Sequence, residues 1–248
     1  MDKLLTVVIP SYNVEKFLNQ TLDSFICDEA VMKKFEVIVV DDGSKDNTAK
    51  IGKEYADKYP DTFRVISKEN GGHGSTINCG IRNAVGKYFK VVDGDDWVNT
   101  ADFVKLVEDL EKTESEYVFT NYYEYYDDVN RQKAVDFPQF KDGTEYDFAD
   151  VANKVYIPMH ALVIKTSVLK DNNIVIDEKC FYVDVEYVMF PVPFVNKVTF
   201  FDLHVYMYRL ALSTQSVSIL GFQKHINDHL RVTFHTVSYT HLRAHETG

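Results

Sequence analysis

VIVVDDGS (residues 37–44) and YFKVVDGDD (residues 88–96) are the two stretches that decide the fold. In each, a short apolar run ends in acidic residues and glycine, which is typical of a buried strand in an α/β sheet. Sheets of this kind bind ligands at the carboxyl ends of their strands. We therefore expect the acidic residues to gather at the functional edge of the sheet.

Asp93, Asp95 and Asp96 follow one predicted strand directly. Like charges about 4 Å apart repel by roughly 1 kcal/mol in water and about 4 kcal/mol at an effective dielectric constant near 20. These carboxylates therefore need a compensating cation. A divalent metal ion that bridges to a phosphate is the simplest candidate.

The composition is that of a globular protein, with 248 residues and a net charge of −11. A nucleic-acid partner is disfavoured, because phosphate backbones require a basic face. The three cysteines, Cys27, Cys79 and Cys180, are widely spaced, which favours reduced thiols buried in a cytoplasmic protein. The apolar run at the start is too short for a signal peptide, and no stretch approaches the ~18 apolar residues of a membrane span. We expect a cytoplasmic protein, with the inner face of the membrane as an alternative through peripheral contact.

Hydrophobic periodicity predicts alternating strands and helices in the first half, and hence a mostly parallel, right-handed wound sheet. Strands are expected at 6–9, 37–40, 63–66 and 88–92, and helices at 14–26, 48–55, 75–85 and from Asn99 or Thr100. The second half is expected to contain an aromatic strand at 117–126, a hairpin turn at 127–130, a polar loop at 139–146, a strand at 198–208 and a polar loop at 213–218.

Residues 237–248 continue no periodic pattern and resemble a translated sequencing-adapter tail. We interpret them as non-native and leave them out of the functional reasoning. The natural protein is then expected to be longer, with residues 219–236 as the start of a C-terminal helical region.

Three motifs have the order and spacing of the family 2 glycosyltransferases: TVVIPSYN (residues 6–13), VDDGS (40–44) and DGDD (93–96). Each motif alone also describes receiver domains and other nucleotide binders, but the three together resemble this family over residues 4–218. The resemblance implies a GT-A type α/β fold, with a Rossmann-like, mostly parallel central sheet flanked by helices. It implies one domain over residues 1–218, with a nucleotide-sugar-binding half (1–115) and a mixed α+β acceptor-binding half (116–218).

The resemblance places the nucleotide base against Tyr12 and Asp42, with backbone contacts from Pro10. A base needs a stacking surface and an acceptor for its ring N–H, and both side chains follow adjacent strands. Tyr12 as an ordinary surface aromatic and Asp42 as a turn residue are the structural alternatives.

Asp93-Gly94-Asp95 resembles the Asp-x-Asp motif of the family. There the last aspartate ligates Mn²⁺ or Mg²⁺ and the first orients the ribose and the metal shell. Hard cations choose oxygen ligands, often one or two carboxylates with substrate phosphates. Asp96 is a weaker candidate at the same edge, and a solvated acidic turn is the alternative interpretation.

The glycine-rich loop at 70–74 offers backbone N–H groups for a phosphate or the donor sugar, with Gly72 as the residue assigned to the nucleotide. A purely connecting role into a helix capped by Ser75 is an equal alternative. His73 is interpreted as a loop residue rather than a catalyst.

Asp184 resembles the family's catalytic base, although Val183 stands where the family commonly has glutamate. An inverting transfer needs one carboxylate to take the proton of the acceptor hydroxyl. A plain helix cap is the alternative for Asp184, and Glu186 is the fallback base. Pro191 and Pro193 limit the helix that follows to about two turns.

Arg209 and His160 are weaker candidates. Arg209 is placed either on the diphosphate or in a structural ion pair. His160 lies where acceptor-facing residues would fall, yet a lone histidine is more often a partly buried structural residue. The tyrosines of 117–126 are either core residues or a surface that stacks on sugars.

Together these features predict a metal-dependent, inverting glycosyltransferase that moves a sugar from a nucleotide-sugar donor, expected to be UDP-linked, to a glycan or lipid-linked acceptor. Bacterial surface polysaccharide or cell-wall synthesis is the role that the resemblance implies. The alternatives are a non-catalytic nucleotide-sugar-binding fragment and a sugar-phosphate nucleotidyltransferase. The latter is expected to have a glycine-rich, basic signature after the first strand, which residues 10–13 lack.

Overall fold

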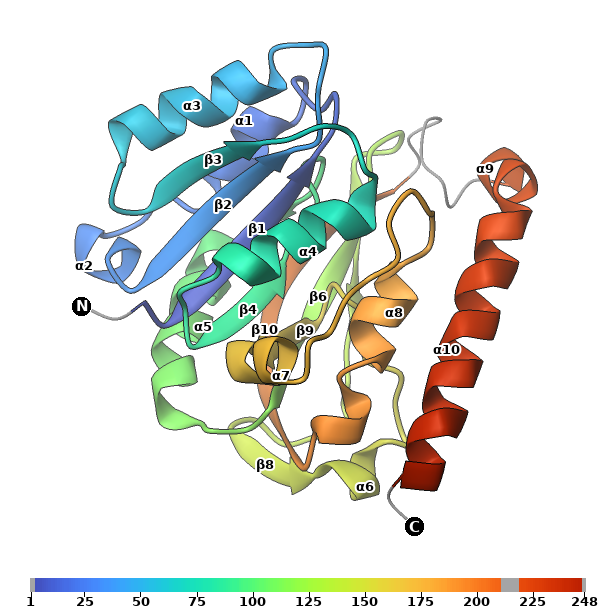
Figure 1. The fold of residues 1–248 in the computed structure, drawn as a ribbon. Helices are drawn as coiled ribbons and strands as arrows, with labels where there is room; N and C mark the ends of the chain where they lie inside the picture. Colours follow the sequence, from blue (N-terminus) through green and yellow to red (C-terminus); the bar gives the residue numbers. More distant parts are fainter. Residues whose placement is uncertain (1–2, 211–218, 247–248) are drawn as a thin grey trace.

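The computed structural model describes residues 3–210 and 219–246. Its centre is one mixed sheet of ten strands among these residues, with the order β3-β2-β1-β4-β9-β6-β10-β5, β7 beside β6 and β8 beside β10 (Figure 1). The strands are β1 (Leu5–Ser11), β2 (Phe35–Asp41), β3 (Phe63–Ser67), β4 (Tyr88–Val91), β5 (Trp97–Val98), β6 (Tyr117–Tyr126), β7 (Arg131–Val135), β8 (Thr144–Asp147), β9 (Leu162–Lys165) and β10 (Lys197–Leu210). The helices are α1 (Leu18–Asp23), α2 (Glu29–Met32), α3 (Thr48–Lys58), α4 (His73–Asn83), α5 (Thr100–Asp109), α6 (Phe148–Val151), α7 (Thr166–Asp171), α8 (Asp184–Met189), α9 (Ile219–Lys224) and α10 (Ile226–Glu246), with short 3₁₀ turns at Leu110–Lys112 and Val192–Phe194.

The first half is parallel, as predicted, because each of its strands returns through a helix. β1 lies between β2 and β4, and β3 pairs with β2, all in parallel register. The second half is mixed: β9 is antiparallel to both β4 and β6, while β6 and β10 are parallel. The predicted α/β class with a mixed second half is therefore confirmed.

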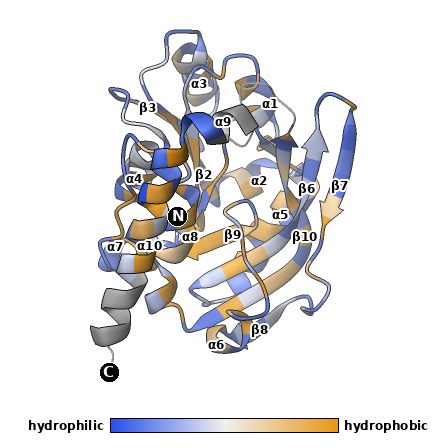
Figure 2. Cartoon of the chain, turned by 90° about the vertical axis from the view of Figure 1, so that its right-hand side faces the viewer, coloured by the Kyte–Doolittle hydropathy of each residue, from blue (hydrophilic) through white to orange (hydrophobic). Residues whose placement is uncertain are grey.

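Two hydrophobic layers sandwich the sheet, because neighbouring side chains of a strand point to opposite faces. On β1, Val8 joins the layer beneath α4, α7 and α8, whereas Val7 joins the layer beneath α1 and α5. In Figure 2 many of the apolar residues lie along the strands in the middle of the molecule, and the β6–β7 hairpin projects away from them. Both layers hold the strand ends in fixed relative positions.

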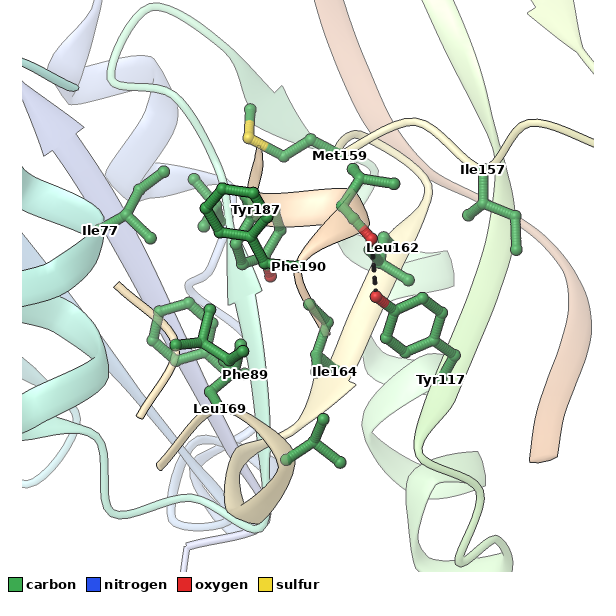
Figure 3. Close-up of a cluster of buried hydrophobic side chains, with 14 of the residues drawn as sticks. Ile77, Phe89, Tyr117, Ile157, Met159, Leu162, Ile164, Leu169, Tyr187 and Phe190 are labelled. Atoms are coloured by element: carbon green, nitrogen blue, oxygen red, sulfur yellow. Dashed lines mark hydrogen bonds between the residues drawn. The ribbon is translucent and has the colours of Figure 1, made fainter. Parts of the chain in front are cut away.

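Helix α8 is anchored on the sheet by two buried tyrosines (Figure 3). Tyr187 packs its ring 6.2 Å from that of Phe89 on β4. The Tyr117 hydroxyl of β6 donates a 2.8 Å hydrogen bond to the Val188 carbonyl. These contacts fix the helix that begins at Asp184.

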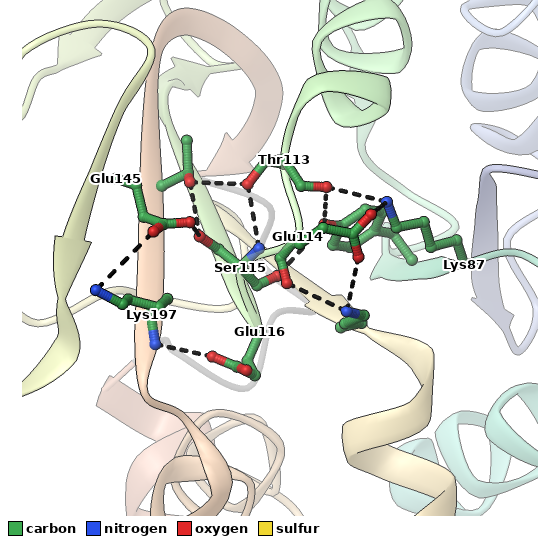
Figure 4. A network of polar contacts seen from close by, with 10 residues as sticks. Lys87, Thr113, Glu114, Ser115, Glu116, Glu145 and Lys197 are labelled. Atoms are coloured by element: carbon green, nitrogen blue, oxygen red, sulfur yellow. Dashed lines mark hydrogen bonds and ion pairs between the residues drawn. The ribbon is translucent and has the colours of Figure 1, made fainter.

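A polar network ties the amino ends of the central strands together (Figure 4). Before β6, the Ser115 hydroxyl bonds Thr199 of β10 and Glu145 of β8, at 2.8 Å each. Glu114 forms ion pairs with Lys87, just before β4, and with Lys165, the last residue of β9. This network lies at the end of the sheet opposite to the acidic residues, so its role is structural.

Several predicted elements differ in extent. The predicted helix 14–26 shrinks to α1, because Asn13 takes a left-handed φ of 55° and the Val14 N–H is bound by the Thr48 hydroxyl. The predicted loop at 139–146 contains the start of edge strand β8. Ser75 is not a helix cap, since α4 already begins at His73 after Gly72. The loop predicted at 213–218 lies outside the described residues.

The C-terminal segment is helical, and α10 extends to Glu246 through residues interpreted above as non-native. Their origin and the domain boundaries remain predictions. Within the ranges 3–210 and 219–246, no helix combines the length and apolarity that a membrane crossing requires.

Gly86 lies in the connection between α4 and β4, where the backbone passes very close to that of β1. Its φ is not positive, so a left-handed backbone is not the reason for glycine at this position. A Cβ atom here would lie 2.5 Å from both the Leu5 carbonyl carbon and the Thr6 nitrogen. Those are backbone atoms of a central strand, which cannot move aside.

We expect Gly86→Ala to destabilise the fold by about 1–3 kcal/mol, the usual cost of overpacking a rigid site. Chemical unfolding of both proteins measures the difference. Val85→Ala is the matched control: Val85 is 64% exposed, and its truncation is expected to change stability by less than about 0.5 kcal/mol. A Gly86→Ala protein as stable as the parent would contradict the close approach.

Candidate active site

A cavity of about 410 Å³ opens at the carboxyl ends of β1 and β4 and is bounded on its far side by the start of α8. It brings together residues from both halves of the chain, as a ligand site at the edge of an α/β sheet would. Its lining comprises Pro10, Tyr12, Val14, His73, Asp93, Gly94, Asp95, Asp96, Met159, His160, Phe181, Tyr182, Val183, Asp184 and Tyr208.

The acidic turn after β4 is held against the end of β1. The Gly94 N–H donates to the Pro10 carbonyl at 3.1 Å, and a Cβ atom on Gly94 would approach that same oxygen to 2.9 Å. A side chain at position 94 would therefore push the two strand ends apart. Gly94 keeps Asp93 and Asp95 beside Pro10 in the cavity wall.

Asp96 is the buried anchor of this turn, with 2% of its surface exposed. Its carboxylate accepts hydrogen bonds from the Tyr206 hydroxyl at 2.6 Å and from the Arg209 backbone N–H at 2.7 Å. Burial, followed by the charges of Asp95 and Asp93, raises the pKa of Asp96 well above its usual value. The carboxylate thus depends on β10 for its stabilisation.

Asp93 pairs with His73, whose Nε2 lies 2.7 Å from the Asp93 carboxylate. Burial alone would lower the pKa of His73, but the charge of Asp93, with smaller contributions from Asp184 and Asp95, raises it. Burial likewise opposes ionisation of Asp93, yet His73 outweighs it and lowers the pKa of Asp93. The raised pKa favours the protonated form of His73, which lines the cavity as the first residue of α4 and not as part of the preceding loop.

Asp95 is half-buried and faces the same cavity. Burial, together with the charge of Asp93, raises the pKa of Asp95 to about 6. Carboxylates that are so reluctant to ionise indicate a place for a positive charge. Ligand atoms of Asp93, Asp96 and His160 lie within 4.8 Å of one another, a spacing that could hold a metal ion. This group contains Asp93 and the weaker candidate Asp96, but not Asp95.

Asp184 is the first residue of α8, after Val183 at the cap position, and its side chain lines the cavity. Burial raises the pKa of Asp184, and Asp93 adds to this while His73 opposes it. Glu186 cannot share the role of base, because it is completely buried and accepts hydrogen bonds from the Asp177 N–H and from His235.

Asp42, which was predicted to contact the nucleotide base, is buried and bound by protein donors. Asp42 is 2% exposed, and its carboxylate accepts hydrogen bonds from Lys68 and from the backbone N–H groups of Gly71 and Gly72. The glycine loop therefore donates to Asp42 instead of offering these two N–H groups to a phosphate. Pro10 and Tyr12 do line the cavity, and Tyr12 is 51% exposed there.

Arg209 makes several contacts within the protein, while its predicted contact with a diphosphate stays a prediction. Arg209 is 5% exposed; its guanidinium donates to the Asp95 carbonyl and to Gln20, and forms an ion pair with Asp127. It also lies 4.6 Å above the Trp97 ring. The structural ion pair, which was the alternative, is the one observed.

His160 stands in the cavity wall between aromatic rings. It stacks on Tyr208 with ring centroids 3.9 Å apart and meets Tyr206 edge-on at 4.9 Å. Burial lowers the pKa of His160 to about 4, so its ring is neutral near pH 7. The buried ammonium of Lys90 donates to the His160 carbonyl at 2.8 Å, and burial lowers the pKa of Lys90 to about 7.

The sequence analysis missed Lys68, Lys90 and Tyr206. Lys90 carried a visible signal, as a charged residue inside an apolar strand. Lys68 and Tyr206 carried none, because their partners, Asp42 and Asp96, lie 26 and 110 positions away in the chain.

Comparisons with known proteins agree with this arrangement. The sequence profile of "Glycosyl transferase family 2" matches residues 6–172. "Uncharacterized glycosyltransferase EpsJ" of Bacillus subtilis is 37% identical over 123 residues, which are 50% of this chain and 35% of that protein. "Minor teichoic acid biosynthesis protein GgaB" of the same organism is 34% identical over 111 residues, 45% of this chain and 12% of that protein.

Solved structures share the fold. S. aureus TarS 1–349 in complex with UDP-GlcNAc has a TM-score of 0.73 at 23% identity, covering 87% of this chain and 61% of that one. Mannosyltransferase PcManGT from Pyrobaculum calidifontis, in complex with GDP-Man and Mn²⁺, has a TM-score of 0.66 at 17% identity. The match covers 95% of this chain and 65% of that one. The chain thus spans about a third of the curated EpsJ relative and under two thirds of TarS 1–349. With its profile match over more than half of the sequence, its GT-A type fold and its acidic cavity, the chain belongs to glycosyl transferase family 2.

Proposed function

We propose that this chain transfers a sugar, with inversion, from a nucleotide-sugar donor to an acceptor hydroxyl, assisted by a divalent cation. The observation that carries the proposal is the convergence of Asp93, Asp95 and Asp184 on one cavity at the carboxyl ends of the parallel strands. Two of these carboxylates have a raised pKa. Two separate tasks, charge compensation and proton abstraction, are thereby assigned to different walls of the same cavity.

The donor lies on the β1 and β4 wall in this proposal. Pro10 and Tyr12 would border the base, while Asp93 and Asp95 would hold Mn²⁺ or Mg²⁺. When bound, the cation neutralises the charge that develops on the departing nucleoside diphosphate. His73, when protonated, would add a positive charge on the same side. The structures of relatives named for complexes with UDP-GlcNAc and with GDP-Man and Mn²⁺ support a donor of this class.

The acceptor approaches from the α8 wall. Asp184 takes the proton of the acceptor hydroxyl as its oxygen bonds to the anomeric carbon, and the bond from that carbon to the diphosphate oxygen breaks on the opposite face. One displacement of this kind inverts the anomeric centre. The burial of Glu186 supports the choice of Asp184, since no second carboxylate of α8 opens to the cavity.

The acceptor is proposed to be a growing glycan or a lipid-linked glycan of a bacterial surface polymer. The relative named for minor teichoic acid biosynthesis supports this class. The same role places the protein in the cytoplasm, where nucleotide sugars are made.

Slow donor hydrolysis tests the proposal without knowledge of the acceptor. A panel of UDP- and GDP-sugars is incubated with the chain and Mn²⁺, and released nucleoside diphosphate is measured by chromatography. Release from at least one donor, which stops on addition of EDTA and returns with Mn²⁺, is expected. Binding of a nucleotide sugar without any release would indicate a binding module instead.

Asp184→Asn is expected to reduce sugar transfer by about 10²–10⁴-fold, the usual contribution of a general base. The Kd of the nucleoside diphosphate should change little, because Asp184 lies on the acceptor wall. Asp57→Asn is the control, as an exposed residue of α3 away from the cavity. Unchanged turnover in Asp184→Asn would remove this residue from the mechanism.

The dependence of kcat/KM on pH also tests the role of Asp184. Only ionised Asp184 can accept a proton, and burial raises the pKa of Asp184 above the ordinary 3.8. We expect kcat/KM at saturating Mn²⁺ to fall as the pH drops through this raised pKa, so the acid limb lies above pH 3.8. The residual activity of Asp184→Asn should lack that limb. If kcat/KM of Asp184→Asn still falls at the same acidic pH, another titrating group causes the fall.

A further inference from the structure

Phe181 is an exposed aromatic residue in the wall of the cavity, three positions before Asp184. It is 44% exposed to solvent. A single exposed apolar residue is common and needs no explanation by itself. Phe181, however, borders the cavity on the α8 side, where the acceptor is proposed to approach. Its surroundings therefore decide whether it has a role.

The backbone on both sides of Phe181 is strained. Among the described residues, five non-glycine residues have a left-handed backbone, and three of them are asparagines. Asparagine tolerates this conformation, whereas lysine and tyrosine adopt it rarely. The two exceptions are Lys179 (φ 53°) and Tyr182 (φ 65°), which flank Cys180 and Phe181. Strain of this kind costs free energy and is found mainly at sites where function requires the strained form.

Contacts from two other parts of the chain hold this segment. The Lys179 N–H donates a 2.6 Å hydrogen bond to the carbonyl of Gly71 in the glycine loop. The ring of His225, between α9 and α10, stacks on Phe181 with ring centroids 3.7 Å apart and an interplanar angle of 28°. His225 is not among the residues that line the cavity, so Phe181 presents a different part of its surface there. The result is a fixed aromatic surface beside Asp184.

An aromatic surface next to a carboxylate suits a pyranose ring. A pyranose has an apolar face of C–H groups, and covering that face with an aromatic ring is favourable, as burial of apolar surface is in general. Its hydroxyl groups remain free to reach Asp184. An acyclic polyol phosphate has no such face, and its negative charge would raise the pKa of Asp184 further, because a like charge disfavours ionisation. The base must be ionised to act.

We propose that Phe181 determines acceptor specificity: the terminal pyranose of the acceptor stacks on its ring and thereby presents a hydroxyl group to Asp184. The inference rests on the proposed function, which needs an acceptor hydroxyl at Asp184 but does not require a ring-shaped acceptor. Phe181 contributes binding and orientation in this proposal, and Asp184 alone takes the proton.

Ligand binding tests the stacking without a transfer assay. The methyl pyranosides of glucose, galactose, mannose and N-acetylglucosamine, together with ribitol 5-phosphate and glycerol 3-phosphate, are titrated against the full chain with UDP and Mn²⁺ in saturation-transfer difference NMR. At least one pyranoside is expected to bind through its ring C–H groups, and more tightly than either polyol phosphate. Phe181→Ala should weaken this binding by about 10-fold or more, through the loss of apolar contact. Phe181→Tyr keeps the aromatic ring and should bind as the parent does.

Phe234→Ala is the matched control, because Phe234 of α10 is 68% exposed and does not line the cavity. It should leave the pyranoside affinity unchanged. The inference is overturned if no pyranoside binds, if Phe181→Ala binds as tightly as the parent, or if a polyol phosphate binds more tightly than every pyranoside. Donor hydrolysis by the parent separates the two proposals. If the parent releases nucleoside diphosphate in any of these cases, only the role of Phe181 fails, and if it releases none, the proposed function fails with it.

Discussion

The crowding of three carboxylates at the end of one strand, one of them buried and two half-buried, is the constraint on which the rest of this structure depends. Asp96 is enclosed and needs two donors, which come from Tyr206 and the Arg209 backbone on β10, more than a hundred positions later. The Tyr206 hydroxyl also accepts a hydrogen bond from the Asp93 N–H. The second half of the chain therefore completes the acidic turn of the first, and neither half would hold this turn alone.

The same dependence explains how the second half is built. Arg209 contacts the Asp95 carbonyl, Gln20 and Asp127, so its charge stabilises the underside of the turn. Because β9 is antiparallel between β4 and β6, His160 just before it returns to the carboxyl end of β4. Helix α8 is held near the same edge because its Tyr187 packs on Phe89 of β4. Three segments distant in sequence thus reach one cavity through sheet register.

The sequence predicted those parts that local patterns determine. Apolar runs followed by Asp41 and Asp93 marked two parallel strands. A helix was expected from Asn99 or Thr100, and α5 begins at Thr100 with the Asn99 side chain as its cap. Other details depend on register between distant strands. The direction of the Arg209 side chain follows from the pairing of Arg209 with Tyr125, which no local pattern contains. The capture of Asp42 by Lys68 and the glycine loop likewise requires the folded arrangement.

Environment divides the acidic residues of the site into two groups, and this division limits what each can do. Asp42 and Asp96 are almost fully buried and bound by protein donors, and Glu186 is sealed beneath α10. Exchanging their partners during a reaction would leave buried donors unpaired, which is costly. Asp93, Asp95 and Asp184 instead border the cavity, where a ligand can replace or add a partner. Carboxylates whose environments differ in this way take different roles in one site. The proposed reaction therefore uses the second group, while the first group holds it in place.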